Sequence, residues 1–177
     1  MKRPGDKGPT GGEVRLVAAP DAQGPPQVVS RSIEQITSPR LREVFEVWRQ
    51  KCAAADRLPP AEEFDIFDYR AAVGNINLIE VRPEPLDFIF RVHCVTGASY
   101  VGRDLTGCSV DDYPDPEYRA YVRSVFTRAT AERQPQIIIE SLETADHRRM
   151  RWEGIVMPLQ NRAGAVTRLI VTFEIVN

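Results

Sequence analysis

Three long runs of β-branched and apolar residues close the chain, and they constrain its fold more than any other feature. The runs cover residues 137–144, 149–159 and 166–176. Asn161–Gly164, a sequence typical of tight turns, separates the last two. Consecutive strands joined by short turns pair in antiparallel fashion, so we expect a three-stranded meander. We also expect a β-bulge at Gly154, because glycine inside a strand is typical of bulges.

Two amphipathic helices are predicted before this meander. Ser38 can cap the first, over residues 38–52, and Pro39 suits its first position because proline has no N–H to leave unpaired. Its apolar stripe consists of Leu41, Val44, Phe45, Trp48 and Cys52. Asp115 and Pro116 give the same signal for a second helix, which should end near Arg133. Each stripe must be buried against another element.

Two further strands, over residues 75–81 and 87–94, lie between these helices. Alternation in the second predicts one face formed by Phe88, Phe90, Val92 and Cys94, and an opposite face formed by Ile89, Arg91 and His93. Small residues and Gly102–Gly107, a glycine-bounded turn sequence, follow. The fold class is therefore α+β: a five-stranded antiparallel sheet with flanking helices, and the N-terminal amphipathic helix covering its other face.

Composition indicates one domain and excludes several classes of function. With 177 residues, 42% of them hydrophobic, the chain can form one core over residues 30–177, preceded by a flexible Gly- and Pro-rich tail at 1–29. A net charge of −2 gives no reason to expect nucleic acid, and no run suits a membrane span or a secretion signal, so we expect a cytoplasmic protein. Cys52, Cys94 and Cys108 lack paired zinc-ligand spacing, so we expect free thiols and no metal.

In this order and spacing, several short motifs resemble the PAS superfamily, and within it a compact family of standalone proteobacterial PAS-like domains. The resemblance covers about residues 40–176. The motifs are the Leu41–Trp48 helix, Leu58-Pro59 followed by Phe64-Asp65, Leu78–Val81, Phe88–Arg91, Gly102–Gly107, and the hairpin from Met157-Pro158-Leu159 through Gly164 to Ile170. Two positions depart from the family pattern: Cys94 replaces a usual glycine, and Phe67 replaces a common proline.

The resemblance implies a noncatalytic sensory or regulatory module that binds a small apolar ligand, a protein partner, or both. The expected ligand-site residues are Phe88, Phe90, Val92, Cys94, Thr96, Ser99, Tyr100, Trp152 and Phe173. The expected interface for a partner or a second copy lies on the N-terminal helix and consists of Leu41, Val44, Phe45 and Trp48. The alternatives are a solidly packed core in place of a pocket, a cone-shaped enzyme of the ketosteroid-isomerase type, and a pure dimerisation or scaffold domain.

No residue pattern in the sequence identifies a cofactor or a catalytic group. His93 is interpreted as an outward-facing strand residue rather than a haem ligand, and His147 as part of a polar hairpin turn. Cys94 and Cys108 lack the amide-rich surroundings expected of a flavin-adduct thiol. Gly102–Gly107 lacks the Gly-Lys-Ser/Thr ending of a phosphate-binding loop.

Overall fold

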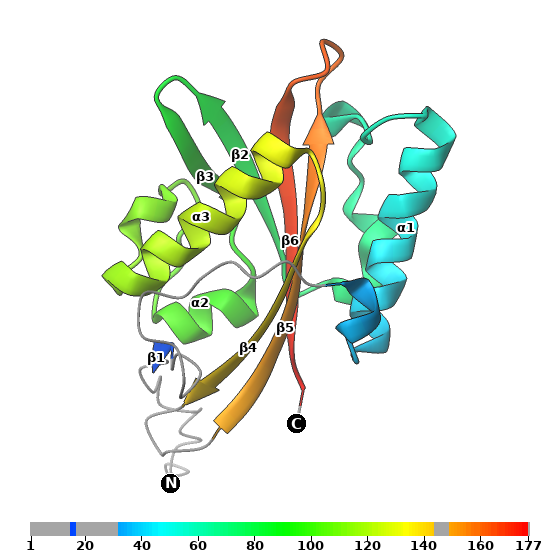
Figure 1. Cartoon of the computed structure of the whole chain (residues 1–177). Helices are drawn as coiled ribbons and strands as arrows, with labels where there is room; N and C mark the ends of the chain where they lie inside the picture. Colours follow the sequence, from blue (N-terminus) through cyan, green and yellow to red (C-terminus); the bar gives the residue numbers. More distant parts are fainter. Residues whose placement is uncertain (1–14, 17–31, 144–148, 177) are drawn as a thin grey trace, which may run out of the picture.

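A single antiparallel sheet organises the computed structural model, which describes residues 15–16, 32–143 and 149–176. Its strands are β1 (Arg15–Leu16), β2 (Ile76–Pro83), β3 (Leu86–Val92), β4 (Gln136–Glu143), β5 (Arg149–Gln160) and β6 (Val166–Val176). The strand order across the sheet is β1-β4-β5-β6-β2-β3. Five long strands and the two-residue β1 therefore confirm the predicted α+β fold, with helices on both faces (Figure 1).

Helices and short 3₁₀ segments fill the connections between the strands. The α-helices are α1 (Pro39–Ala55), α2 (Val95–Val101) and α3 (Pro116–Glu132). The 3₁₀ segments are η1 (Ile33–Gln35), η2 (Ala61–Glu63), η3 (Ile66–Ala72) and η4 (Val110–Asp112). Both long helices begin as their sequences predict: the Ser38 hydroxyl accepts the Leu41 N–H at 3.1 Å, and Asp115 accepts two N–H groups of the first turn of α3.

The predicted meander is confirmed, except for its bulge. The hairpin between β5 and β6 closes with the Asn161 N–H donating to the Ala165 carbonyl at 2.8 Å. Gly154 pairs regularly with Ile138 and with Phe173, and the register shift of β5 lies instead between Leu159 and Gln160. The bulge prediction was therefore wrong. Gly154 is needed for close approach, since a Cβ there would lie 3.2 Å from the Thr172 carbonyl oxygen.

One face of the sheet packs against α1, and we call it the α1 face. Leu41, Val44 and Trp48 of the helix are buried there with strand residues such as Ile155 and Ile170. The helix therefore covers the sheet as its amphipathic stripe predicts. Each large apolar side chain buried in this way contributes about 1.5–3 kcal/mol to folding.

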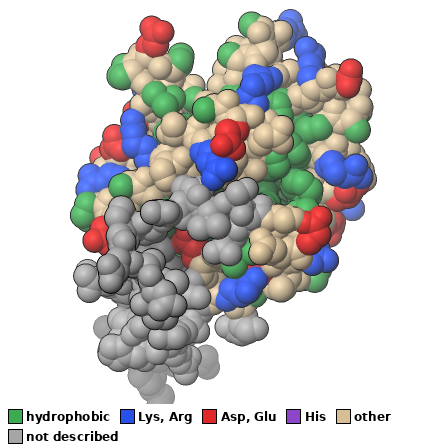
Figure 2. Space-filling model, viewed as in Figure 1, with side chains coloured by type: hydrophobic (Ala, Val, Ile, Leu, Met, Phe, Trp, Pro, Cys, Tyr) green, Lys and Arg blue, Asp and Glu red, His purple; other side chains and the backbone are tan. Residues whose placement is uncertain are grey.

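The opposite face packs against α2, η4 and α3, and we call it the α3 face. Its core contains Phe88 and Phe90 of β3 with Val125 and Phe126 of α3. Figure 2 shows apolar side chains gathered between α3 and α1 on the side in view, with charged side chains over the outer surface. The two faces thus hold two separate cores.

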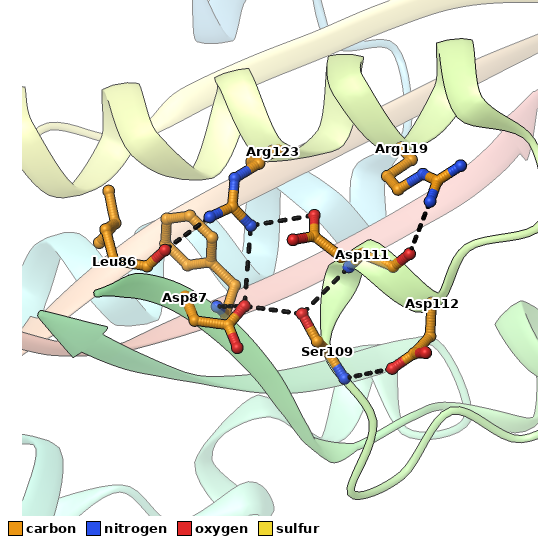
Figure 3. Close-up of polar contacts among 8 residues, drawn as sticks. Leu86, Asp87, Ser109, Asp111, Asp112, Arg119 and Arg123 are labelled. Carbon is orange, nitrogen blue, oxygen red and sulfur yellow. Dashed lines mark hydrogen bonds and ion pairs between the residues drawn. The ribbon is translucent and has the colours of Figure 1, made fainter. Parts of the chain in front are cut away.

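A network of polar contacts fastens α3 to β3 and η4 (Figure 3). The Arg123 guanidinium pairs with Asp111 at 3.0 Å, lies 3.7 Å from Asp87, and donates to the Leu86 carbonyl. The Ser109 hydroxyl donates to Asp87 at 2.6 Å. Burial alone would raise the pKa of Asp87, but these contacts hold it below its ordinary value. The carboxylate therefore stays ionised and anchors the helix.

Several predictions concern residues outside the described ranges. The polar turn at His147 lies there, as does the predicted tail at 1–29 apart from Arg15–Leu16, which pair with Glu143 and Leu142 of β4. Within the part of the chain that is described, no helix is long and apolar enough to cross a membrane.

Candidate ligand site

Three of the predicted site residues, Tyr100, Trp152 and Phe173, meet on the α3 face, and we call them the aromatic cluster. Trp152 of β5 stacks on Phe173 of β6, with ring centroids 4.3 Å apart and planes 19° apart. Tyr100 of α2 meets Trp152 edge to face at 5.4 Å. Phe173 is buried, whereas Tyr100 and Trp152 are only half-buried. Side chains of this kind offer a ligand both an apolar surface and polar ring edges.

Gly154 of β5 lies beside this arrangement, on the strand next to that of Phe173. Gly154 pairs directly with Phe173, and a Cβ at this position would lie 3.4 Å from the Phe173 Cβ. That distance is at the tight limit of van der Waals contact. The glycine therefore leaves space for the Phe173 ring beside Trp152.

Phe88 and Phe90 lie in a filled part of the same face. Phe88 packs edge to face on Phe126 at 5.5 Å, and Phe90 does the same on Tyr113 at 5.7 Å. Their exposed fractions are 0% and 1%. These two predicted site residues therefore occupy a packed core, as the packed-core alternative holds for this region.

A register shift in β3 overturns two predictions about side-chain direction. Ile79 pairs with Phe90, but Leu78 pairs with Val92, so β3 contains one extra residue. Because Leu78 belongs to the core of the α1 face, Val92 turns to that face, where it is 41% exposed. His93 turns the other way and meets Phe90 on the α3 face at 5.0 Å. The prediction that Val92 shares a face with Phe90 is therefore wrong, and so is the prediction that His93 faces outward.

His93 is a buried polar group that sequence alternation missed. Its side chain is 1% exposed, and Nδ1 accepts the Leu105 N–H at 3.0 Å. Burial lowers the pKa of His93, which the Asp104 carboxylate at 3.6 Å opposes only in part. The neutral imidazole thus holds the Gly102–Gly107 turn against β3.

Cys94 caps α2, and Thr96 and Ser99 lie within that helix. The polar groups of all three residues bond to the helix and its surroundings. The Cys94 thiol caps α2 by accepting the Gly97 N–H at 3.2 Å, and burial raises its pKa, which keeps it protonated. Thr96 donates to Asn75 at 2.6 Å, and the exposed Ser99 donates to the Thr96 carbonyl at 2.7 Å. These groups position α2, and with it Tyr100.

Two tyrosines and one carboxylate join this face without having been predicted. Tyr113 and Tyr118 meet edge to face at 5.0 Å, and burial raises the pKa of both hydroxyls. Glu140 of β4 pairs in register with Trp152, and its charge further raises the pKa of Tyr118. Tyr118 lies in the apolar stripe of α3, and that stripe was the only feature of the sequence that could have placed it on this face.

On the opposite face, the same two strands hold the start of α1 through Glu153 and Glu174, which we call the carboxylate pair. They are direct cross-strand partners, each following a residue of the aromatic cluster. Glu153 is fully buried and accepts the backbone N–H groups of Thr37 at 2.8 Å and Ser38 at 2.9 Å. Burial raises the pKa of Glu153, but these donors and Arg151 outweigh it, so the net shift is downward. Glu174 accepts the Ser38 hydroxyl.

The predicted interface stripe on α1 faces the protein's own sheet. Leu41 and Val44 are 0% exposed, and the Trp48 indole donates to the Pro158 carbonyl at 3.1 Å. Phe45 is half-buried and stacks on Trp48 at 5.9 Å. A partner cannot contact the three buried side chains unless α1 leaves the sheet. The scaffold alternative requires exposed apolar residues on this helix. The three buried side chains therefore do not support it.

A depression of about 500 Å³ lies at the far end of α1, away from the aromatic cluster. It is lined by Arg57, Pro60, Glu62, Glu63, Gln160, Asn161 and Arg162. Over the described ranges, no group of three or more His, Cys, Asp or Glu side chains is arranged to hold a metal ion.

Comparison with known proteins agrees with this architecture. A family model described as "PAS domain" matches residues 36–173. A search of curated proteins gives no match. Solved structures also match at low identity, among them the following three. A light-oxygen-voltage domain studied with a flavin analogue has a TM-score of 0.47 and 12% identity over 66% of this chain and 88% of its own.

The Vibrio cholerae VqmA dimer, described with LuxR-type receptors, has a TM-score of 0.46 and 10% identity over 59% of this chain. The match spans 46% of that receptor, less than half of its length. An RNA-binding light-oxygen-voltage receptor has a TM-score of 0.40 and 21% identity over 66% of this chain and 35% of its own.

Proposed function

Because this chain belongs to the PAS domain family, which fits a sensory or regulatory module, we propose that it is a noncatalytic sensor that binds a small, largely apolar molecule at the aromatic cluster. The observation that carries the proposal is the incomplete burial of Trp152 and Tyr100 beside the buried Phe173. Elsewhere on this face the aromatic rings are packed solidly against α3. A ligand that stacks on Trp152 would remove apolar surface from water at about 25 cal/mol per Å².

The chemistry around the cluster supports binding rather than catalysis. The Cys94 thiol and the hydroxyls of Tyr113 and Tyr118 have raised pKa values, so these groups are protonated near neutral pH and are poor nucleophiles. His93 is enclosed, and its Nδ1 is occupied by the Leu105 N–H.

The carboxylate pair offers a route from the ligand to α1. Trp152 and Glu153 are consecutive in β5, and Phe173 and Glu174 are consecutive in β6, so each pair points to opposite faces. A ligand that changes the spacing of the two aromatic rings acts on the strand positions that hold Thr37 and Ser38. We infer that occupancy biases the position of the α1 start, and that a protein partner in the cytoplasm reads this change.

Native mass spectrometry and a visible absorption spectrum of the purified chain test for a retained ligand. Binding can then be followed with 8-anilinonaphthalene-1-sulfonate as the apolar probe. Trp48→Phe leaves Trp152 as the only indole, and we expect saturable energy transfer from it to the probe. In the same background, Tyr100→Ala should weaken binding, whereas Glu43→Gln on the exposed side of α1 should not.

A retained mass that is lost on Tyr100→Ala would also support the proposal. If no mass is retained and the probe binds equally well to Tyr100→Ala and to the parent, the ligand proposal is wrong. Circular dichroism of each variant shows whether the fold is intact, so that unfolding is not mistaken for loss of the site.

A further inference from the structure

Large apolar side chains that remain exposed gather in two segments of the described structure. They are Ile66, Phe67, Val73, Val92 and Val95. The first three belong to η3 and its end, and the last two flank the junction between β3 and α2. A soluble domain gains nothing by exposing such residues, and their clustering is typical of an interaction surface.

Hydrogen bonds tie these two segments together. The Thr96 N–H donates to the Gly74 carbonyl at 3.5 Å, and the Thr96 hydroxyl donates to Asn75 at 2.6 Å. The Cys94 N–H donates to the Asn77 side chain at 2.8 Å. Val73 and Val95, which are 62% and 79% exposed, therefore lie on adjoining parts of the surface. We call residues 62–73 with Val95 the η3 surface.

The local fold directs Phe67 outward and gives it no role in the core. Asp65 caps η3 by accepting the Phe67 N–H at 2.9 Å, while Tyr69 and Ala72 point into the core. Tyr69 stacks on Phe64 at 5.6 Å. Phe67 remains 75% exposed. The backbone that carries Phe67 is thus anchored through its neighbours, while the side chain is exposed to solvent.

The charges around Phe67 select the kind of partner. Glu62, Glu63, Asp65 and Asp68 are all exposed within the same short stretch, which holds one exposed basic residue, Arg70. Lys51 pairs with Asp68 at 2.7 Å, and no ion pair is found for the other three carboxylates in the described residues. Glu62 and Glu63 also line the 500 Å³ depression, together with Arg57 and Arg162. An apolar side chain flanked by carboxylates is complementary to a basic, amphipathic segment.

We propose that the η3 surface docks a basic amphipathic segment of a partner protein, whose apolar side chains cover Ile66 and Phe67 while its Lys or Arg side chains meet Glu62, Glu63 and Asp65. This surface is separate from the aromatic cluster, so the proposal does not depend on ligand binding there.

The test uses the full chain labelled with ¹⁵N and a short synthetic helical peptide with Leu on one face and Lys on the other. We expect the peptide to shift amide signals of residues 62–73 and 94–96, and a peptide with Glu in place of Lys to leave them unchanged. Phe67→Ser and Glu63→Lys should each raise the dissociation constant roughly fivefold or more. Glu43→Lys, on an exposed acid of α1, is the matched control and should have no effect.

The proposal is overturned if the two peptides bind equally, if the shifts map to other residues, or if Glu43→Lys weakens binding as much as Glu63→Lys. Sedimentation of the chain alone tests whether a second copy of the chain covers this surface. A dimer that dissociates on Phe67→Ser would show that a second copy covers this surface, and would also overturn the proposal. Because Phe67 is exposed, its replacement should leave the fold intact, and circular dichroism verifies this.

Discussion

Replacement of Glu153 by glutamine tests whether the carboxylate pair anchors α1 to the sheet. One carboxylate oxygen accepts the backbone N–H groups of Thr37 and Ser38, and the other accepts the Thr37 hydroxyl and the Arg151 guanidinium, all at 2.8–2.9 Å. Glutamine retains one of these oxygens and places an amide NH₂ where the other was. At least one charge-assisted bond is then lost, and such bonds contribute about 1.5–3 kcal/mol each.

We therefore expect Glu153→Gln to lower the free energy of unfolding by about 2 kcal/mol. Glu153→Ala should cost about 3–4 kcal/mol, because it leaves two buried N–H groups without an acceptor. The matched variant is Glu174→Gln, whose partners are the Ser38 hydroxyl and the exposed Arg40. It should cost about 1 kcal/mol or less, since the hydroxyl can rotate to another acceptor. Urea unfolding of the three variants measures these values.

The pH dependence of stability tests the anchoring role of Glu153 independently. The pKa of Glu153 in the folded state lies below the ordinary 4.5, so its stabilisation is complete above that pH and is lost as the pH falls through the folded value. The difference between wild type and Glu153→Gln should therefore shrink below pH 4.5. A constant difference down to low pH, or a cost under about 0.5 kcal/mol at neutral pH, would refute the anchoring role.

Three other variants probe contacts on the α3 face. Gly154→Ala should cost about 1–2 kcal/mol and reduce the near-ultraviolet dichroism of the Trp152–Phe173 stack, because the new Cβ meets the Thr172 carbonyl at 3.2 Å; an unchanged spectrum would contradict this. Wild-type stability should fall as the pH drops below 6.5, because the folded-state pKa of His93 is lowered. His93→Asn should make stability less dependent on pH in that range, as measured by urea unfolding at several pH values. Arg123→Gln should cost about 1 kcal/mol and speed hydrogen exchange at the start of α3, unless its contacts to Asp111 and Leu86 contribute nothing.

The local signals in the sequence predicted the elements well. Ser38-Pro39 and Asp115-Pro116 begin their helices as expected, since capping depends only on a few neighbouring residues. The meander and its Asn161–Gly164 turn follow equally from local pattern. The burial of the α1 stripe against the sheet follows from its apolar spacing.

Side-chain direction at the end of β3 could not be predicted in the same way. A register shift depends on how two strands pair, and alternation along one strand contains no sign of it. The register shift in β3 places Val92 on the α1 face and His93 on the α3 face, the reverse of the expectation. Of the predicted site residues, Tyr100, Trp152 and Phe173 lie together, whereas Phe88 and Phe90 are packed in the core.

The alternation of aromatic and acidic residues on β5 and β6 limits which insertions and deletions the chain can tolerate. Loss of one residue inside either strand would turn Trp152 or Phe173 beneath α1 and carry Glu153 or Glu174 to the α3 face. A single deletion would therefore disrupt both the aromatic cluster and the carboxylate pair. Length variation in this hairpin should therefore be confined to the turn at residues 161–165, beyond the irregularity at Leu159–Gln160.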